Sequence, residues 1–366
     1  MYRKILALLL CGMMILLVGC GKEEEKKPAE ESSTVSVESE PEVIYYVNNL
    51  TGEQNMTDKD KVDDRPVAVM INNISVAQKV QTGLTKADII YETEVEGGIT
   101  RLMAVYKDIS KVDKIGTIRS ARYPYIDLAM GHGAIYVHHG QDNNYAKPHL
   151  RDTQTFAIGE NNAGARIRNE GLSTEHTLYG YGDKIWKWFE KKNFNTELKS
   201  VENWQNFAAA DKTVAFTDLA DTVTVKFSSA YTSVFKYDEK SQKYVRYFRD
   251  TKRKDYYTGE SELFKNVFVL KTSITYYPDG KHKRVDLSSG SGYYCVNGTY
   301  TPIKWKKGSS SNGLKFTTTD GKPLEVSQGN SWVCLHGKNF APKFESSKKT
   351  ESKTEIKTNA VTSAKK

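Results

Sequence analysis

The chain lacks the sequence signatures of several common kinds of site. Only four of its 366 residues are cysteine, and no two of them have the spacing of a zinc site. There is no serine or cysteine nucleophile motif and no phosphate-binding glycine loop. The sequence therefore offers no complete catalytic motif, and we expect neither a cofactor nor a bound metal.

The N-terminus carries an apolar run, residues 5–18, that follows two basic residues. The run is too short for a well-flanked transmembrane helix, and it ends in Leu-Val-Gly-Cys at 17–20, which resembles a bacterial lipobox. A plain signal peptide or an N-terminal anchor helix is the alternative. The lipobox predicts a lipoprotein signal peptide at 1–19 and a mature chain that begins at a lipidated Cys20, carrying diglyceride and palmitate. Because several acyl chains anchor a protein stably, we expect it on the outer face of the cell membrane.

Two segments that flank the body have the composition of disordered chain. Residues 20–42 are acidic and Ser-rich, and residues 342–366 are rich in Lys, Ser and Thr without an apolar period. Neither segment can bury enough surface to offset its ordering entropy, so we predict a disordered acidic tether and a disordered basic tail. The net charge of +8 favours anionic surroundings, but the basic residues do not gather in one stripe, and no nucleic-acid partner is expected.

The body is too long for one small core and predicts two domains, giving an α+β protein. The first, residues 43–210, mixes strand-like and helical patterns and is expected to be an α/β domain. We predict strands at 66–71, 86–91, 100–106 and 134–138, and helices at 123–130 and 183–190.

The second domain, residues 218–341, reads as a series of hairpins. Asn297-Gly298 and Asp320-Gly321 each separate two strand-like runs, which is a strong signal for a tight hairpin. We therefore predict a mostly antiparallel β domain. Its two cysteines, Cys295 and Cys334, suit either a disulfide in an oxidising compartment or two buried thiols, and the sequence leaves both open.

The stretch 91–140 gathers more acids, guanidinium groups and imidazoles than any other part of the chain. Three glutamates, Glu92, Glu94 and Glu96, alternate along a predicted strand and would share one face. Carboxylates in a row need cationic neighbours, or one of them must hold its proton at neutral pH. A protonated carboxyl beside an ionised one is the arrangement that glycosidases use, so Glu94 and Glu96 are candidate catalytic residues. A solvated strand face with surface ion pairs is the alternative.

The segment 116–122 precedes a predicted helix and carries Arg119, Ser120 and Arg122. Backbone N–H groups and two guanidinium groups at a helix start suit an anionic ligand. Alternatively, the guanidinium groups of Arg119 and Arg122, together with Arg101, neutralise the nearby glutamates. His138 and His139 end a strand and point to opposite faces, so one of them, which we take as His138, faces the site. No ligand spacing joins them, which disfavours a metal.

Six short motifs are spread over the body. They are Gly-Gly-Ile-Thr-Arg-Leu (97–102), Gly-Thr-Ile-Arg-Ser-Ala-Arg (116–122), Ala-Ile-Tyr-Val-His (134–138), Ile-Lys-Trp-Lys-Lys (303–307), Asp-Gly-Lys-Pro-Leu (320–324) and Gly-Asn-Ser-Trp-Val (329–333). With these motifs the body resembles the YerB-like lipoproteins of Gram-positive bacteria. The resemblance implies a lipid-anchored, two-domain extracytoplasmic protein, and it supplies no reaction because the family is uncharacterised.

Two functions of different class follow. The first is a lipoprotein that binds a cell-envelope ligand, which could be wall glycan, an anionic wall polymer or a protein partner. Its predicted ligand-binding residues are Glu92, Arg101, Arg119, Ser120, Arg122 and His138. The second is a peptidoglycan glycan-cleaving enzyme that uses Glu94 or Glu96 as its general acid. Because the sequence contains no complete catalytic motif, we favour the ligand-binding lipoprotein.

Overall fold

A computed structural model describes residues 43–169 and 171–347 of the chain. The predicted signal peptide, Cys20 and the acidic tether lie outside the described residues, as does most of the predicted basic tail. Across the two described ranges, no helix is both long enough and apolar enough to cross a membrane.

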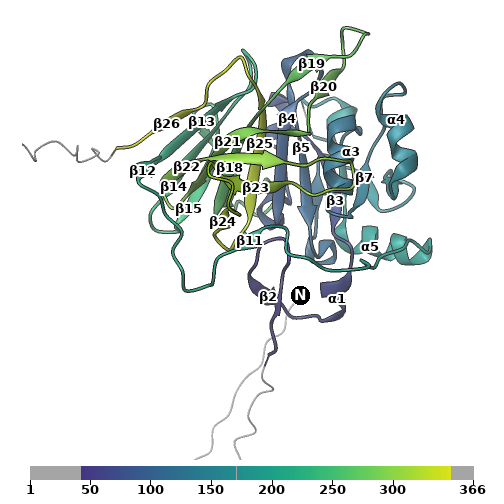
Figure 1. Ribbon diagram of the computed structural model, residues 1–366. Helices are drawn as coiled ribbons and strands as arrows, with labels where there is room; N and C mark the ends of the chain where they lie inside the picture. The colour runs from purple at the N-terminus through teal and green to yellow at the C-terminus, as the bar shows by residue number, and fades with distance from the viewer. Residues whose placement is uncertain (1–42, 170, 348–366) are drawn as a thin grey trace, which may run out of the picture. The chain divides into compact units, whose positions relative to one another are not determined.

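One mixed sheet of 11 strands runs through both parts of the chain (Figure 1). Its strands lie in the order β12 (Asp218–Leu219), β22 (Thr299–Lys306), β21 (Ser289–Val296), β18 (Asn266–Thr272), β25 (Ser331–Gly337), β4 (Ile89–Glu94), β5 (Thr100–Tyr106), β3 (Val67–Asn72), β7 (Ile135–His138) and β8 (Thr155–Ala157), and β23 (Lys315–Thr318) pairs with β22. The C-terminal part of the chain contributes β12, β22, β21, β18, β23 and β25, and the N-terminal part contributes β4, β5, β3, β7 and β8. The fold class is α+β with a largely β C-terminal part, as predicted.

The two parts of the chain meet where β25 pairs in parallel with β4, with Val333 opposite Tyr91. Both strands are buried along nearly their whole length, as strands in the middle of a sheet covered on both faces must be. The regions that we expected to form separate domains therefore share one sheet, and the chain from residue 44 onward belongs to one compact unit.

A second sheet has the order β16 (Thr251–Lys252), β15 (Lys243–Phe248), β14 (Thr232–Asp238), β13 (Thr222–Lys226) and β26 (Lys343–Glu345), and β17 (Leu263–Phe264) pairs with β15. The expected start of the disordered tail at residue 342 is wrong, because β26 pairs with β13 and Ser347 donates a backbone hydrogen bond to Asp221. The basic composition of this segment hid the strand, in which Phe344 stacks on Tyr300.

Shorter elements complete the fold. The helices are α1 (Asp60–Asp63), α2 (Ser75–Gln78), α3 (Tyr123–Met130), α4 (Ala146–His149) and α5 (Gly182–Lys191), with 3-10 turns at Leu84–Lys86, Glu96–Gly98, Ile109–Lys111, Leu150–Asp152 and Thr174–His176. The remaining strands are β1 (Tyr46–Val47), β2 (Gln54–Met56), β6 (Ile115–Gly116), β9 (Gly164–Arg166), β10 (Leu178–Gly180), β11 (Asn206–Phe207), β19 (Ile274–Tyr276), β20 (Lys283–Val285) and β24 (Glu325–Val326).

The predicted elements fall close to the observed ones. The patterns at 123–130 and 183–190 correspond to α3 and α5, and the pattern at 100–106 corresponds to β5. Asn297 and Gly298 both have positive φ, at 50° and 71°, and join β21 to β22 in the predicted tight hairpin.

Each face of the large sheet has its own core. Alternate residues of β3 point to opposite faces, so that Val69 and Ile71 belong to one hydrophobic cluster and Met70 to the other. The cluster that contains Met70 also contains Ile126 of α3, so this helix covers that face. The cluster on the opposite face includes α5 and the inner residues of the second sheet.

Cys295 and Cys334 are both buried, free thiols. Cys295 on β21 lies opposite Val267, whereas Cys334 on β25 lies opposite Val269, so β18 separates the two cysteines. Two strand spacings amount to about 10 Å, which exceeds the Cα separation that a disulfide spans. Of the two alternatives that the sequence left open, the structure has the buried thiols.

A buried polar network lies between the two sheets and is centred on Glu92 of β4. The Glu92 carboxylate accepts hydrogen bonds from Thr100 Oγ1 at 2.9 Å, Ser233 Oγ at 2.8 Å and Trp332 Nε1 at 3.2 Å. Burial raises the pKa of Glu92, and the charge of Arg246 opposes that rise. The four residues on β4, β5, β14 and β25 thus tie the second sheet to the first.

The guanidinium of Arg246 on β15 completes this network. It donates to Glu262 at 2.9 Å and to the side chain of Asn73 at 3.1 Å, and it lies over the Trp332 ring at 4.4 Å. Arg246 and Glu262 have no exposed surface. Such a buried pair stabilises a fold only while both members are present, because a lone buried charge is costly.

Arg246→Met should therefore lower the free energy of unfolding by about 3–5 kcal/mol, since it leaves Glu262 unpaired and Glu92 without its cation. Chemical denaturation followed by tryptophan fluorescence measures the change. Lys252→Met, an exposed change on β16 of the same sheet, is the control and should shift stability by no more than about 0.5 kcal/mol. A loss below about 1 kcal/mol for Arg246→Met would show that the network is not needed to hold the sheets together.

Candidate functional site

The predicted row of three carboxylates does not form one site. Glu92 is only 1% exposed and belongs to the buried network, so it reaches no ligand. Strand β4 ends at Glu94, and Glu96 begins a 3-10 turn that contains Gly97 and Gly98 at φ values of 67° and 69°. The turn breaks the alternation on which the prediction depended, and it carries Glu96 away from the face of Glu92.

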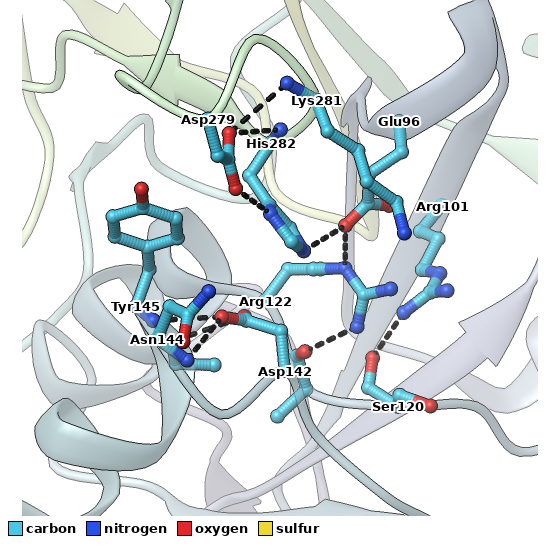
Figure 2. A network of polar contacts seen from close by, with 12 residues as sticks. Glu96, Arg101, Ser120, Arg122, Asp142, Asn144, Tyr145, Asp279, Lys281 and His282 are labelled. Atoms are coloured by element: carbon cyan, nitrogen blue, oxygen red, sulfur yellow. Dashed lines mark hydrogen bonds and ion pairs between the residues drawn. The ribbon is translucent and has the colours of Figure 1, made fainter.

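Glu96 instead meets Arg122 at the start of α3 and the hairpin between β19 and β20 (Figure 2). Its Oε1 accepts a hydrogen bond from Arg122 Nε and lies 3.4 Å from His282 Nε2. The other ring nitrogen of His282, Nδ1, lies 2.5 Å from Asp279 Oδ2. We call these four residues, Glu96, Arg122, Asp279 and His282, the Glu96 cluster.

The cluster holds its two carboxylates in the ionised form. Burial raises the pKa of Glu96, but the charge and hydrogen bond of Arg122 outweigh burial and leave that pKa below its usual range. The hydrogen bond with His282 lowers the pKa of Asp279 to about 2. At neutral pH the cluster therefore presents two carboxylates that have no proton to give.

Arg101 of β5 lies behind the cluster and is 6% exposed. Burial and the repulsion of Arg122 lower its pKa to about 9, and the charge of Glu96 opposes that shift. Arg101 donates to the backbone carbonyl of Ser120, so Ser120 takes part through its main chain (Figure 2). Arg101, the second guanidinium of the site beside Arg122, is thus held in place by a hydrogen bond within the protein.

Glu94 pairs with a residue of the same hairpin as His282. Lys283 Nζ lies 2.9 Å from Glu94 Oε1 and 3.8 Å from the centre of the Tyr276 ring. The hairpin residues Asp279, His282 and Lys283 were missed in the sequence because they lie more than 180 positions after Glu96 and beside a turn signal, Pro278-Asp279-Gly280. The available sequence signal was His282, which lies three residues after Asp279 in that turn.

Two other predicted site residues lie elsewhere. Arg119 contacts the carbonyl and the carboxylate of Glu175, each at 2.9 Å. His138 is 2% exposed, and its ring nitrogens contact Gly140 O and Thr155 Oγ1. Burial lowers the pKa of His138, so it is a neutral core histidine that faces no ligand.

The space inside the Glu96 cluster is small. Its cavity of about 10 Å³, lined by Glu96, Tyr123 and Tyr145 among others, has the size of a single water molecule. A larger cavity of about 510 Å³ shares Tyr123 with it and continues along α3 and the hairpin. Its lining is Tyr123, Asp127, Ser273, Thr275, Arg284, Val285, Asp286, Leu287, Ser288, Gly308, Ser309 and Ser310. We call this second cavity the Asp127 cavity.

The Asp127 cavity is lined mainly by hydroxyl and charged groups. Asp127 is 7% exposed, and its Oδ1 has no hydrogen-bond partner in the protein. Such a buried acceptor favours a ligand that donates a hydrogen bond. Within residues 43–169 and 171–347, no three His, Cys, Asp or Glu side chains are placed to hold a metal ion.

Comparison with known proteins now places the chain in a family. Residues 50–195 match the N-terminal domain, and residues 223–333 the C-terminal domain, of a protein family of unknown function, DUF3048. A candidate lipoprotein of Bacillus subtilis (strain 168), YerB, is 28% identical over 327 residues, which are 88% of this chain and 92% of YerB. The crystal structure of the YerB protein from Bacillus subtilis superposes with a TM-score of 0.67 and 26% identity, covering 79% of this chain and 96% of that one.

The two matched domains define the class, which is a two-domain family without an assigned activity. The chain belongs to this DUF3048 family, of which YerB is a relative, and the resemblance seen in the sequence motifs is confirmed.

His282→Ala should raise the pKa of Asp279 from about 2 toward the ordinary value of about 4, because the hydrogen bond that stabilises the carboxylate is lost. A pH titration of the Asp279 carboxyl carbon by NMR measures it. The depressed pKa means that this contact stabilises the fold above about pH 4 and that the contribution disappears as the pH falls toward 2. Lys281→Ala keeps the backbone N–H that also contacts Asp279 and should leave the pKa nearly unchanged. Equal pKa values in both variants would refute the assignment.

Proposed function

We propose that the protein is a lipoprotein on the outer face of the cell membrane that binds a cell-envelope ligand in the Asp127 cavity, next to the Glu96 cluster. The relation to a candidate lipoprotein supports the anchor, as does the lipobox that ends at Cys20. The observation that carries the binding function is the shared boundary at Tyr123, which joins a charged cluster to a cavity large enough for a ligand.

The lining of the Asp127 cavity suits a ligand that is rich in hydroxyl and amide groups. Asp127 offers an unused acceptor, Arg284 offers guanidinium donors, and serine and threonine hydroxyls surround them. Wall glycan has the matching donors and acceptors, so we take peptidoglycan glycan as the preferred ligand. An anionic wall polymer or a protein partner would be the alternative occupant.

The electrostatics favour binding over glycan cleavage. A general acid must hold a proton near neutral pH, and Arg122 lowers the pKa of Glu96 instead of raising it. The carboxyl whose pKa burial raises is Glu92, which is sealed between the sheets. Glu94 is held by Lys283. The pair of carboxyls that the enzyme hypothesis requires is therefore not supported at this site.

Binding is tested by sedimenting the full-length protein with purified peptidoglycan. Arg284→Gln and Asp127→Ala, both in the cavity lining, should each weaken co-sedimentation by about tenfold, since each removes a charged hydrogen-bonding group. Arg249→Gln, an exposed change outside this lining, is the matched control. Unchanged binding in both cavity variants would rule the cavity out as the binding site.

The same incubation tests for cleavage by mass spectrometry of the glycan. We expect intact glycan with the wild type. New glycan termini that disappear in Glu94→Gln and Glu96→Gln would overturn the binding-only proposal and favour the enzyme.

The anchor is tested separately by cell fractionation. Cys20→Ala removes the thiol that takes the lipid, so the variant should leave the membrane fraction and appear in the soluble extracytoplasmic fraction. Full retention in the membrane fraction would contradict the lipobox. Ser33→Ala in the tether, which leaves Cys20 in place, is the control.

A further inference from the structure

A third cavity lies at the C-terminal end of α3, and it shares no lining residue with the Glu96 cluster or the Asp127 cavity. Its volume is about 560 Å³. Its lining is Asn49, Leu50, Gly131, His132, Gly133, Leu198, Ser200, Glu202, Asn203, Trp204, Lys306, Lys307, Ser311, Asn312, Gly313 and Lys315. We call it the Lys306 cavity.

The wall of this cavity concentrates positive charge. Lys306 on β22 lies directly opposite Lys315 on β23, so the two ammonium groups share one side of the hairpin. Like charges in directly opposed positions destabilise a sheet, and neither lysine has an ion-pair partner among the described residues. An anion between them would turn this repulsion into attraction.

A third lysine of the wall is buried. Lys307 is 3% exposed, and its Nζ donates to the carbonyls of Ser309 at 2.8 Å and Ser310 at 2.6 Å. Burial lowers its pKa to about 8, which leaves most of its charge in place at neutral pH. Glu202 is the single acidic side chain of the lining, and the Asp127 carboxylate, which lies outside the lining, attracts Lys307.

One buried acceptor of the lining has no partner in the protein. It is Oδ1 of Asn49, a residue that is 8% exposed, whereas the indole of Trp204 interacts with the Tyr91 hydroxyl. Because a buried acceptor without a partner favours a ligand that donates a hydrogen bond, the site suits a ligand with a hydroxyl group. This acceptor distinguishes the site from a pair of exposed surface lysines.

The imidazole ring of His132, which also lines the cavity, adds no charge. His132 Nε2 lies 2.7 Å from the Tyr91 hydroxyl, and its ring lies 5.8 Å from that of Trp204. Burial and the nearby lysines lower the pKa of His132 to about 3, so it is neutral at physiological pH. The positive charge of the site therefore comes from the lysines alone.

We propose that the Lys306 cavity binds a hydroxyl-bearing phosphate ester, with the phosphate between Lys306 and Lys315 and a ligand hydroxyl at Asn49. A phosphate monoester fits better than a carboxylate because its charge of about −1.5 to −2 at pH 7 matches the two ammonium groups of Lys306 and Lys315. The backbones of Gly131 and Gly313 approach each other closely in this wall, and neither residue has a side chain there. A Cβ atom at position 131 would lie 3.2 Å from Gly313 Cα.

Isothermal titration of the full-length protein in detergent tests this assignment, with glycerol 3-phosphate as the monoester probe. A short poly(glycerol phosphate) is a second probe, which separates a free phosphate monoester from a polymer of phosphodiesters. We expect saturable binding of glycerol 3-phosphate, weaker binding of inorganic phosphate and of the polymer, whose phosphodiesters carry one charge each, and no detectable binding of glycerol. Raising the ionic strength should weaken the affinity, because screening acts on the lysine contacts.

The lysine pair is tested by the double variant Lys306→Gln with Lys315→Gln. The affinity for glycerol 3-phosphate should fall by about tenfold or more, because two charge-assisted contacts are lost. Lys304→Gln is the matched control, since Lys304 lies on the same strand and contacts Thr319 O outside the cavity. Asn49→Leu keeps the approximate size of the side chain and removes the unpartnered Oδ1, so it should weaken binding of glycerol 3-phosphate and leave inorganic phosphate unchanged.

Two results would overturn the proposal: absence of saturable binding for glycerol 3-phosphate, or equal affinity in the double lysine variant and the wild type. Thermal unfolding of each variant without ligand verifies the fold, and the double variant should be no less stable than the wild type because it removes a repulsion. Arg284→Gln in the Asp127 cavity should leave phosphate binding unchanged, so failure of this proposal is separable from failure of the peptidoglycan proposal.

Discussion

The fold depends on one buried carboxylate, Glu92, which lies where the two sheets meet. Its oxygens take hydrogen bonds from three strands and from Asn73, and the guanidinium of Arg246 supplies the compensating charge. A carboxyl group that far from water is tolerated only when its oxygens are hydrogen-bonded, so the network fixes how the strands are placed. Apolar contacts alone would permit the second sheet to slide on the first.

That placement brings together segments from opposite ends of the chain. Because β25 pairs with β4, the C-terminal strands extend the N-terminal sheet, and the hairpin formed by β19 and β20 reaches the start of α3. Glu96 and Arg122 receive His282 and Asp279 from this hairpin. The candidate site is thus a product of both family domains, and neither domain contains all of it.

Helix α3 separates two environments of different charge. At its N-terminal end, carboxylates and cations neutralise each other in the Glu96 cluster, and the neighbouring cavity is rich in hydroxyl groups. Beyond its C-terminal end, the lining of the Lys306 cavity has three lysines and one carboxylate. A neutral hydroxylated ligand suits the first environment and an anionic one suits the second, which is consistent with a protein that contacts more than one component of a cell envelope.

The sequence by itself determined the class of fold, the tight turn at Asn297-Gly298, and the neighbourhood of Glu94, Glu96, Arg101 and Arg122, because each of these depends on local patterns of charge, hydrophobicity and turn residues. Tertiary structure decided the rest. The period-two pattern could not reveal that β4 ends at Glu94, so it grouped Glu92 with Glu96, which the following turn carries away from it. His138 and Arg119 have side chains suited to ligand binding, but neither lies at the site. His138 is buried in the core against Thr155, and Arg119 pairs with Glu175. Asp279 and His282 joined the site, and β4 joined β25, through contacts between residues far apart in the chain, which no single stretch of sequence encodes.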